Sequence, residues 1–206
     1  EIRPRDWSSD VCSSDLKNAV DAAKPFGIPV TVKMRIGIDS DHKTYLEAAD
    51  AAADAGVTWV ALHARTAAQM YEGKADWSAI ANLRDHLRPT GIPVLGNGDI
   101  WSGQDGVRMV KETGCDGVVV GRGCLGRPWL FKDLVNSFNG STERYLPTLF
   151  EVREVMWRHG QLIVEYFESE DRGCKDLRKH MAWYLKGFRV NRELRARFGM
   201  VASFGE

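Results

Sequence analysis

Four short apolar runs lie before residue 122 and are separated by stretches of helical periodicity. The runs cover residues 28–35, 57–63, 92–97 and 117–121. Each is bounded by Gly, Pro or polar residues and is rich in β-branched residues, which is typical of buried strands. Successive runs begin 25 to 35 residues apart, and this spacing holds one strand, one helix and two loops. The pattern predicts a repeated β-α unit.

The stretches between these runs carry the start and stop signals of helices. Helices are predicted over Tyr45–Ala55, Trp77–Leu87 and Gly103–Thr113. The residues that can cap their first turns are Thr44, Asp76 and Ser102, and the glycines that can end the first and third are Gly56 and Gly114. Because the strands are apolar on both faces, we expect a parallel sheet covered by helices. A closed barrel and an open doubly wound sheet both satisfy that pattern.

The chain changes character after Gly126, where helical patterns are no longer interrupted by strands. Long amphipathic stretches near 148–168 and 173–190 predict an all-helical C-terminal domain from about residue 140. The chain as a whole is balanced, with 28 Lys and Arg against 28 Asp and Glu. Residues 172–197, however, hold nine Lys or Arg and only two acids, a net charge of +7. Lys and Arg along helices are suited to phosphate contacts, whereas the aromatic residues Trp183, Tyr184 and Phe188 are interpreted as core.

The first sixteen residues follow neither a strand nor a helix period and repeat the unit Ser-Ser-Asp. We interpret residues 1–16 as a non-native or disordered segment, because they resemble the translation of a sequencing adapter. A natural disordered N-terminus is the alternative. The predicted organisation is therefore this segment, a β-α region over 17–139 and a helical domain over 140–206.

Composition excludes several classes of protein. No apolar run approaches the roughly 18 residues of a membrane span, and no signal segment opens the chain, so we expect a cytoplasmic protein without membrane contact. Four cysteines, Cys12, Cys115, Cys124 and Cys174, stand singly rather than in CxxC pairs. This spacing argues against a zinc site and a disulfide framework, and no metal site is predicted.

Polar side chains occur where each predicted strand ends, which is where parallel α/β folds place their functional groups. The four ends read Lys-Met-Arg, His-Ala-Arg-Thr, Asn-Gly-Asp and Gly-Arg-Gly. A lysine at position 33 in an apolar strand is best explained by an anionic ligand, since desolvating an ammonium group is costly. His63 alone could be a hydrogen-bonded histidine at a strand end. The two Gly-rich turns could be ordinary strand-to-helix turns, but together they favour phosphate binding.

The ordered motifs VKMR, LHART, GNGDI and DGVVVGRGCLGRPW, followed by RKHMAWYL, make the chain similar to the tRNA-dihydrouridine synthase family, and most of all to its bacterial B-type branch. The resemblance covers about residues 17–190. It implies an FMN-binding TIM barrel followed by a helical domain, with the four strands as the last four of eight. The implied fold is thus α/β, a partial TIM barrel with a C-terminal all-helical domain.

The resemblance also implies site residues, cofactors and partners. The residues that it assigns to FMN binding are Lys33, His63, Asn97, Gly98, Asp99, Gly121 and Arg122. Substrate binding falls to Arg35, Arg65, Arg178 and Lys179. Lys33 would stabilise negative charge on the flavin ring, Arg65 would face the flavin or the uridine, and the two Gly-rich turns would hold the ribityl chain and the phosphate. The implied partner is tRNA.

The implied reaction reduces the C5=C6 bond of a uridine in tRNA, with NADPH regenerating the flavin and a cysteine between Gly and Pro donating a proton. The chain contains no Gly-Cys-Pro sequence, so no catalytic residue is assigned and little activity is expected of this polypeptide alone. Two alternatives stay open. One is another FMN-dependent TIM-barrel oxidoreductase, such as a dihydroorotate dehydrogenase-like enzyme, which has no need of a strongly basic helical end. The other is an inactive RNA-binding fragment.

Overall fold

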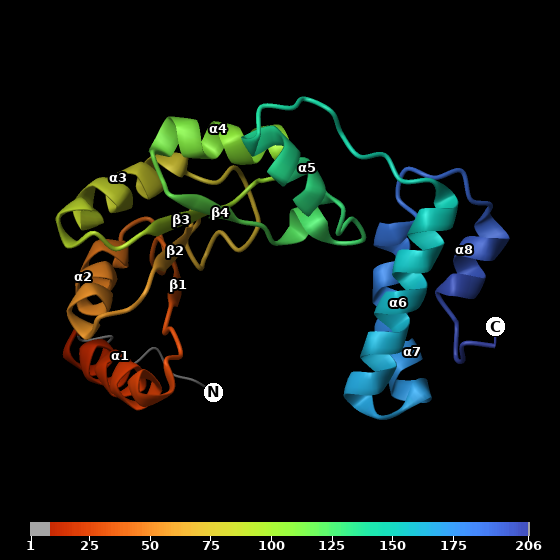
Figure 1. Ribbon diagram of the computed structural model, residues 1–206, viewed down its shortest axis with the longest axis horizontal. Coiled ribbons are helices and arrows are strands. Elements are labelled where there is room, and N and C mark those ends of the chain that lie inside the picture. The colour runs from red at the N-terminus through yellow and green to blue at the C-terminus, as the bar shows by residue number, and fades with distance from the viewer. Residues whose placement is uncertain (1–8, 206) are drawn as a thin grey trace. The chain divides into compact units, whose positions relative to one another are not determined.

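The computed structural model describes residues 9–205, and side chains from residue 13 onward. The chain divides into two compact units (Figure 1). The first contains residues up to Ile100 together with Gln104–Gly121, and the second contains Trp101–Gly103 together with residues from Arg122 onward. The division therefore falls near residue 122 rather than near the expected residue 140. The reason is packing, because Trp129 contacts the hydrophobic core of the C-terminal helices.

The first unit is built on a parallel sheet of four strands in the order β1-β2-β3-β4. The strands are β1 Val32–Arg35, β2 Val60–His63, β3 Val94–Asn97 and β4 Gly117–Val119. The four predicted strands are confirmed, although the first three begin two to four residues later than the apolar runs. Pro29 and Pro93 lie before two of these starts, and a proline has no amide hydrogen to donate to the sheet. All residues of β2 are buried, as expected of an inner parallel strand.

Three helices alternate with these strands, and their limits are those that the sequence predicts. They are α2 Tyr45–Ala55, α3 Trp77–Leu87 and α4 Gly103–Thr113. α2 packs on β1 and β2, and α3 packs on β3 (Figure 1). Asp76 caps α3 by accepting a hydrogen bond from the Ser78 amide at 3.1 Å, whereas Thr44 makes no side-chain bond at the start of α2. Short 3-10 turns, η1 Lys24–Phe26 and η2 Arg88–Thr90, precede the loops that lead into β1 and β3.

The N-terminal segment differs from its prediction. Helix α1 spans Ser9–Ala23 and packs against α2, so residues 9–16 are helical rather than disordered. Ser13, Leu16, Val20 and Ala23 are the less exposed positions, and they recur at helical spacing. The serines of the repeat conceal this periodicity. Residues 1–8 and the side chain of Cys12 lie outside the described residues, and a foreign origin for residues 1–16 stays a prediction.

The described residues of the second unit form helices joined by loops, without a strand. Its elements are η3 Arg122–Cys124, α5 Leu130–Phe138, α6 Leu149–Phe167, α7 Glu170–Tyr184 and α8 Arg192–Phe198. α6 begins with a capping box between Thr148 and Glu151, and Ser169 caps α7. The core of the unit is the contact between α6 and α7, formed by Val152, Met156, Leu177, Met181 and Tyr184. No helix in the described part of the chain is long and apolar enough to cross a membrane.

Candidate functional site at the carboxyl ends of the strands

The strand register brings predicted residues from three strands to one level. Arg35 is paired in register with His63, and His63 with Asn97. Asn97 is in turn level with Val119 at the end of β4. Lys33 precedes Arg35 by two residues and therefore shares its face of the sheet. The sheet thus places polar groups that are distant in sequence at a single edge, as the sequence predicts.

Lys33 is more accessible than its apolar strand suggests. It is exposed, and it forms no salt bridge with any residue that the structure describes. Partial desolvation lowers the pKa of the Lys33 ammonium group, and the nearby Arg35 guanidinium lowers that pKa further. An anion bound beside Lys33 would reverse both effects, because an opposite charge favours the protonated form.

Arg65 lies in a different environment from the one predicted for a substrate contact. Its side chain is only 1% exposed. Nη2 donates to both carboxylate oxygens of Asp99, at 2.9 and 2.8 Å, and to the Gly73 carbonyl at 2.7 Å. Nε donates to the Glu72 carbonyl at 3.1 Å. Arg65 therefore fastens the loop after β2 and does not face solvent.

Asn97 and Asp99 are also used inside the protein. The Asn97 side-chain amide donates to the Val119 carbonyl at 2.7 Å, which ties β3 to β4. The Asp99 carboxylate accepts hydrogen bonds from the Arg65 guanidinium and from the Ala75 amide, the latter at 2.8 Å. Its φ of 54° is in the left-handed region, which aspartate tolerates better than most residues. The side chains of Asn97 and Asp99 are therefore engaged in internal hydrogen bonds, and their predicted contact with a ribityl or phosphate group stays a prediction.

Gly98 fills the position between these two side chains and cannot carry a side chain of its own. Its φ is 133°, and a Cβ there would lie 2.7 Å from the Cβ of Ala75 and 3.6 Å from Cδ2 of His63. Its carbonyl accepts a hydrogen bond from Nε1 of Trp77 at 3.0 Å. The turn after β3 is thus packed tightly against the end of β2 and the start of α3.

His63 and Arg35 lie beside the loop 66–73, which carries no predicted site residue. His63 is 8% exposed, and its ring lies 6.4 Å from the ring of Tyr71. The Arg35 guanidinium is 5.8 Å from the same ring and donates to the Thr66 and Met70 carbonyls at 2.8 and 3.0 Å. Tyr71 itself is 53% exposed. The available signal was the long polar stretch between strand and helix, since extended loops often carry function.

Gly121 ends the first unit and differs from Gly98. It is exposed, and no atom lies within 4 Å of the place a Cβ would take. Packing therefore does not require glycine at this position, and the empty space beside its Cα is suited to the close approach of a ligand.

Arg122, at the start of the second unit, lies over Trp101. The centre of its guanidinium is 5.3 Å from the indole ring. The Trp101 carbonyl accepts from Nη2 of Arg127 at 2.7 Å. Two cations thus gather around one exposed tryptophan.

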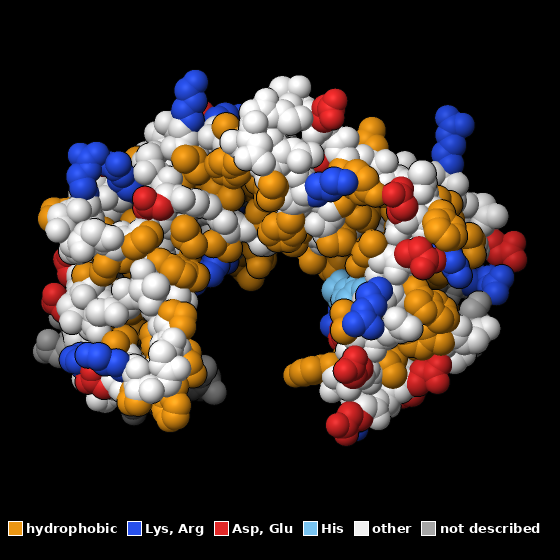
Figure 2. All heavy atoms as spheres, in the orientation of Figure 1, with side chains coloured by type: hydrophobic (Ala, Val, Ile, Leu, Met, Phe, Trp, Pro, Cys, Tyr) orange, Lys and Arg blue, Asp and Glu red, His pale blue; other side chains and the backbone are white. Residues whose placement is uncertain are grey.

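The basic residues of the second unit have mixed roles. Arg178 donates to the Val201 carbonyl at 2.8 Å and so holds the C-terminal segment. Lys179 is exposed and pairs with Asp176 at 2.5 Å. Figure 2 shows basic side chains interspersed with acidic ones over this unit. Tyr184 is buried as predicted, whereas Trp183 is 37% exposed.

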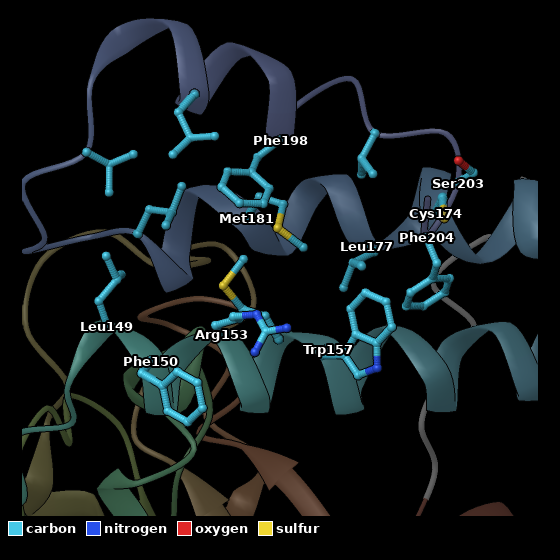
Figure 3. Close-up of a pocket in the computed structure, with 15 residues that line it drawn as sticks. Leu149, Phe150, Arg153, Trp157, Cys174, Leu177, Met181, Phe198, Ser203 and Phe204 are labelled. Atoms are coloured by element: carbon cyan, nitrogen blue, oxygen red, sulfur yellow. The ribbon is translucent and has the colours of Figure 1, made fainter. Parts of the chain in front are cut away.

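A cavity of about 460 Å³ lies among α6, α7 and α8 (Figure 3). It is lined by Leu149, Phe150, Arg153, Met156, Trp157, Cys174, Leu177, Met181, Leu185, Val190, Leu194, Phe198, Val201, Ser203 and Phe204. Arg153 is its charged residue, and it is paired with Glu154 at 2.5 Å. None of the predicted site residues lines this cavity, and its apolar wall is not suited to a phosphate group. Among the described residues no group of three or more His, Cys, Asp or Glu could hold a metal ion.

Comparison with known proteins agrees with the motifs at the strand ends. The family model described as "Dihydrouridine synthase (Dus)" matches residues 8–205. A "Probable tRNA-dihydrouridine synthase" of Mycobacterium tuberculosis (strain CDC 1551 / Oshkosh) is 54% identical over 91% of this chain and 48% of its own length. The "tRNA-dihydrouridine synthase B" of Vibrio vulnificus (strain CMCP6) is 36% identical over 93% of this chain and 58% of its own length.

The corresponding protein of Pasteurella multocida (strain Pm70), also named "tRNA-dihydrouridine synthase B", is 34% identical over 86% of this chain and 52% of its own length. The chain thus spans about half the length of the curated relatives that it matches. The match favours a tRNA-dihydrouridine synthase over the alternative of a dihydroorotate dehydrogenase-like enzyme. The strand-end motifs, the parallel β-α architecture and the family match together show that the chain belongs to the dihydrouridine synthase family.

Proposed function

We propose that the protein reduces the C5=C6 bond of uridine in tRNA to dihydrouridine, with FMN as its bound redox group and NADPH as the source of electrons. The observation that carries this proposal is the alignment of Arg35, His63 and Asn97 at one level of the sheet, beside an exposed Lys33, in a member of this family. The four strands would be the last four of an eight-stranded barrel whose strand ends form the active site.

The residues present fit a flavin phosphate ester. Lys33 supplies an exposed cation whose lowered pKa an anionic ligand would raise again. Gly121 leaves space where a Cβ would lie, and Arg122 supplies a guanidinium that can pair with a phosphate through two hydrogen bonds. Asn97 and Asp99 contribute a turn fixed by internal hydrogen bonds, so the Gly98 backbone is held in place before a ligand arrives.

Each residue then has a defined task in the reaction. FMN, when bound, supplies the hydride that the uracil ring receives. Lys33 holds negative charge near the flavin ring, and a fixed cation at such a place stabilises charge that develops during the reaction. His63 forms a buried wall beside that position, and Arg35 fixes the loop that carries Tyr71. The proton donor stays unassigned.

The tRNA is proposed to bind the helical residues 140–206. Lys175 and Lys179 of α7 are exposed at 58% and 60% of their side chains and are held only by surface ion pairs, which phosphate groups can replace. Arg178 and Arg195 donate to main-chain carbonyls instead and contribute less to phosphate binding. The salt dependence of tRNA affinity should therefore reflect fewer phosphate contacts than the nine Lys and Arg residues of 172–197 would give.

The function is tested in the cell by deleting the gene that encodes the chain and measuring dihydrouridine in purified tRNA by nucleoside mass spectrometry. We expect the loss of dihydrouridine from at least one tRNA position, restored when the gene is returned. An unchanged dihydrouridine content would refute the proposed function.

The cofactor assignment is tested by titrating the purified chain with FMN and following flavin fluorescence. We expect Lys33→Met to weaken FMN binding about tenfold, equivalent to about 1.4 kcal/mol, through loss of one charge contact. Lys24→Met, which removes an exposed lysine from η1 of the same unit, is the matched control and should leave the affinity unchanged. Equal affinities for all three proteins would show that Lys33 does not contact the flavin.

A further inference from the structure

Arg65 joins two segments that are far apart in sequence. From its position directly after β2 it reaches the Glu72 and Gly73 carbonyls at the far end of the following loop and the Asp99 carboxylate in the turn after β3. The side chain is 1% exposed, so these bonds are shielded from water. Nη1 is buried as well and has no hydrogen-bond partner among the described residues. The guanidinium is therefore held through Nε and Nη2.

Asp99 completes the link from the other side. Besides Arg65, its carboxylate accepts from the Ala75 amide at 2.8 Å. One carboxylate thus contacts both the arginine that binds the loop and the residue at which the loop returns toward α3. The left-handed backbone at Asp99, with φ of 54°, points to a conformation that these contacts maintain.

The opposite side of the loop is attached to the segment after β1. The Ala67 and Ala68 amides donate to the Gly37 and Ile38 carbonyls, both at 2.8 Å. Arg35 donates to carbonyls at both ends of the intervening turn, as described above. The charged pair of Arg65 with Asp99 connects this loop to the turn after β3. Through that pair the turn can act on the loop.

We propose that Arg65 and Asp99 form a latch through which occupation of the turn 97–99 orders the loop 66–73 and its exposed Tyr71. Arg65 is then a positioning residue and not a contact for substrate. This inference rests on the proposed function, in which the turn 97–99 lies against the flavin. A flavin bound there restrains Asp99, Asp99 restrains the guanidinium, and the guanidinium restrains the Glu72 and Gly73 carbonyls. The loop is consequently most rigid when the cofactor is present.

Limited proteolysis with chymotrypsin tests the latch, because cleavage after Tyr71 requires local opening of the loop. Peptide mass spectrometry gives the rate of cleavage after Tyr71 relative to cleavage after Phe26, an exposed residue of the same unit. We expect Asp99→Asn and Arg65→Lys each to raise this ratio at least about tenfold, since each disrupts hydrogen bonds between charged groups. Asparagine keeps the size of aspartate and tolerates the left-handed backbone, and lysine keeps the charge of arginine without its planar fork.

The matched control is Arg84→Lys, which alters an arginine of the same unit that donates to the Gly114 carbonyl away from the loop. It should leave the ratio unchanged. FMN should protect Tyr71 in the unaltered protein and in this control, but not in Asp99→Asn. Phe26 is exposed, so the normalisation corrects for the amount and activity of the protease. Urea unfolding of each variant shows whether a general loss of stability accompanies the change in the ratio. If Asp99→Asn does not fold, judged by circular dichroism, Arg65→Lys carries the same test.

Failure of the latch and failure of the proposed function give different results. An unchanged ratio in both variants, without FMN, would overturn the latch whatever the protein binds. FMN that binds without protecting Tyr71 would overturn the coupling between turn and loop. Absence of FMN binding by the unaltered protein would instead contradict the cofactor proposal, and the ratio measured without FMN would still decide whether Arg65 and Asp99 hold the loop.

Discussion

Gly126 is the position where a single methyl group should do most damage to the second unit. Its φ of 64° is left-handed, and a Cβ there would lie 2.6 Å from the Cβ of Trp183 and even closer to the Trp183 carbonyl carbon and the Tyr184 amide nitrogen. The left-handed backbone costs an alanine about 1–2 kcal/mol. Forcing a methyl group against main-chain atoms adds about 1–3 kcal/mol. Gly126→Ala should therefore lower the free energy of unfolding by about 2–5 kcal/mol, a large part of the total for an ordinary domain.

Gly140 provides the control that separates the cost of the left-handed backbone from the cost of the steric clash. Its φ is 86°, and no atom lies within 4 Å of a Cβ at that position. Gly140→Ala should therefore show only the backbone cost of about 1–2 kcal/mol. Both variants would be unfolded in urea and followed by circular dichroism at the helix band, with the slopes compared to confirm that the same surface is exposed. Equal losses in the two variants would mean that the segment 122–130 does not pack on α7 as described.

Three further predictions concern the helices and the half-buried His159. Asp76→Ala should cost about 1 kcal/mol in urea unfolding, because it removes the side-chain cap of α3, whereas Thr44→Ala should change stability by less than about 0.5 kcal/mol. Leu83→Ala, at a fully buried position, should cost about 2–5 kcal/mol by the same measurement. Burial, followed by its histidine neighbour, lowers the pKa of His159 below its usual 6.5. The unfolded state then binds more protons, so the free energy of unfolding should fall as the pH drops through about 6.5. The fall should be less steep in His159→Gln, and parallel stability curves for the two proteins would contradict this.

The sequence predicts the three helices of the first unit to the residue because their signals are local. Apolar periodicity and a polar residue before the first turn are present for each helix within a dozen positions, and a glycine follows the last turn of α2 and of α4. The strand order and register depend on pairing across 25 to 35 residues. They were not predicted from the spacing, because a repeated β-α unit fits both a closed barrel and an open doubly wound sheet. α1 was not predicted, because its less exposed stripe contains a serine and an alanine beside two apolar residues. The division near residue 122 depends on packing of Trp129 and Gly126, which no local pattern records.

The roles of the strand-end residues show a more general limit. A charged residue that follows a parallel strand can either face a ligand or fasten the loops around the site, and the sequence contains the same residue type in both cases. Burial supports different proposed roles for Lys33 and Arg65. Lys33 is exposed with a lowered pKa, as expected of a group that awaits an anion, whereas Arg65 is enclosed and its bonds go to the protein's own carbonyls and carboxylate. A motif can contain both a residue that faces a ligand and a residue that holds the loops around the site. Such a motif identifies a family well, because the chemistry requires the ligand-facing residue and the geometry of the site requires the loop-holding residue. The motif alone does not distinguish the two kinds of residue. From their burial, we expect substitution of Lys33 to alter ligand affinity and substitution of Arg65 to alter the order of the loop that surrounds the ligand.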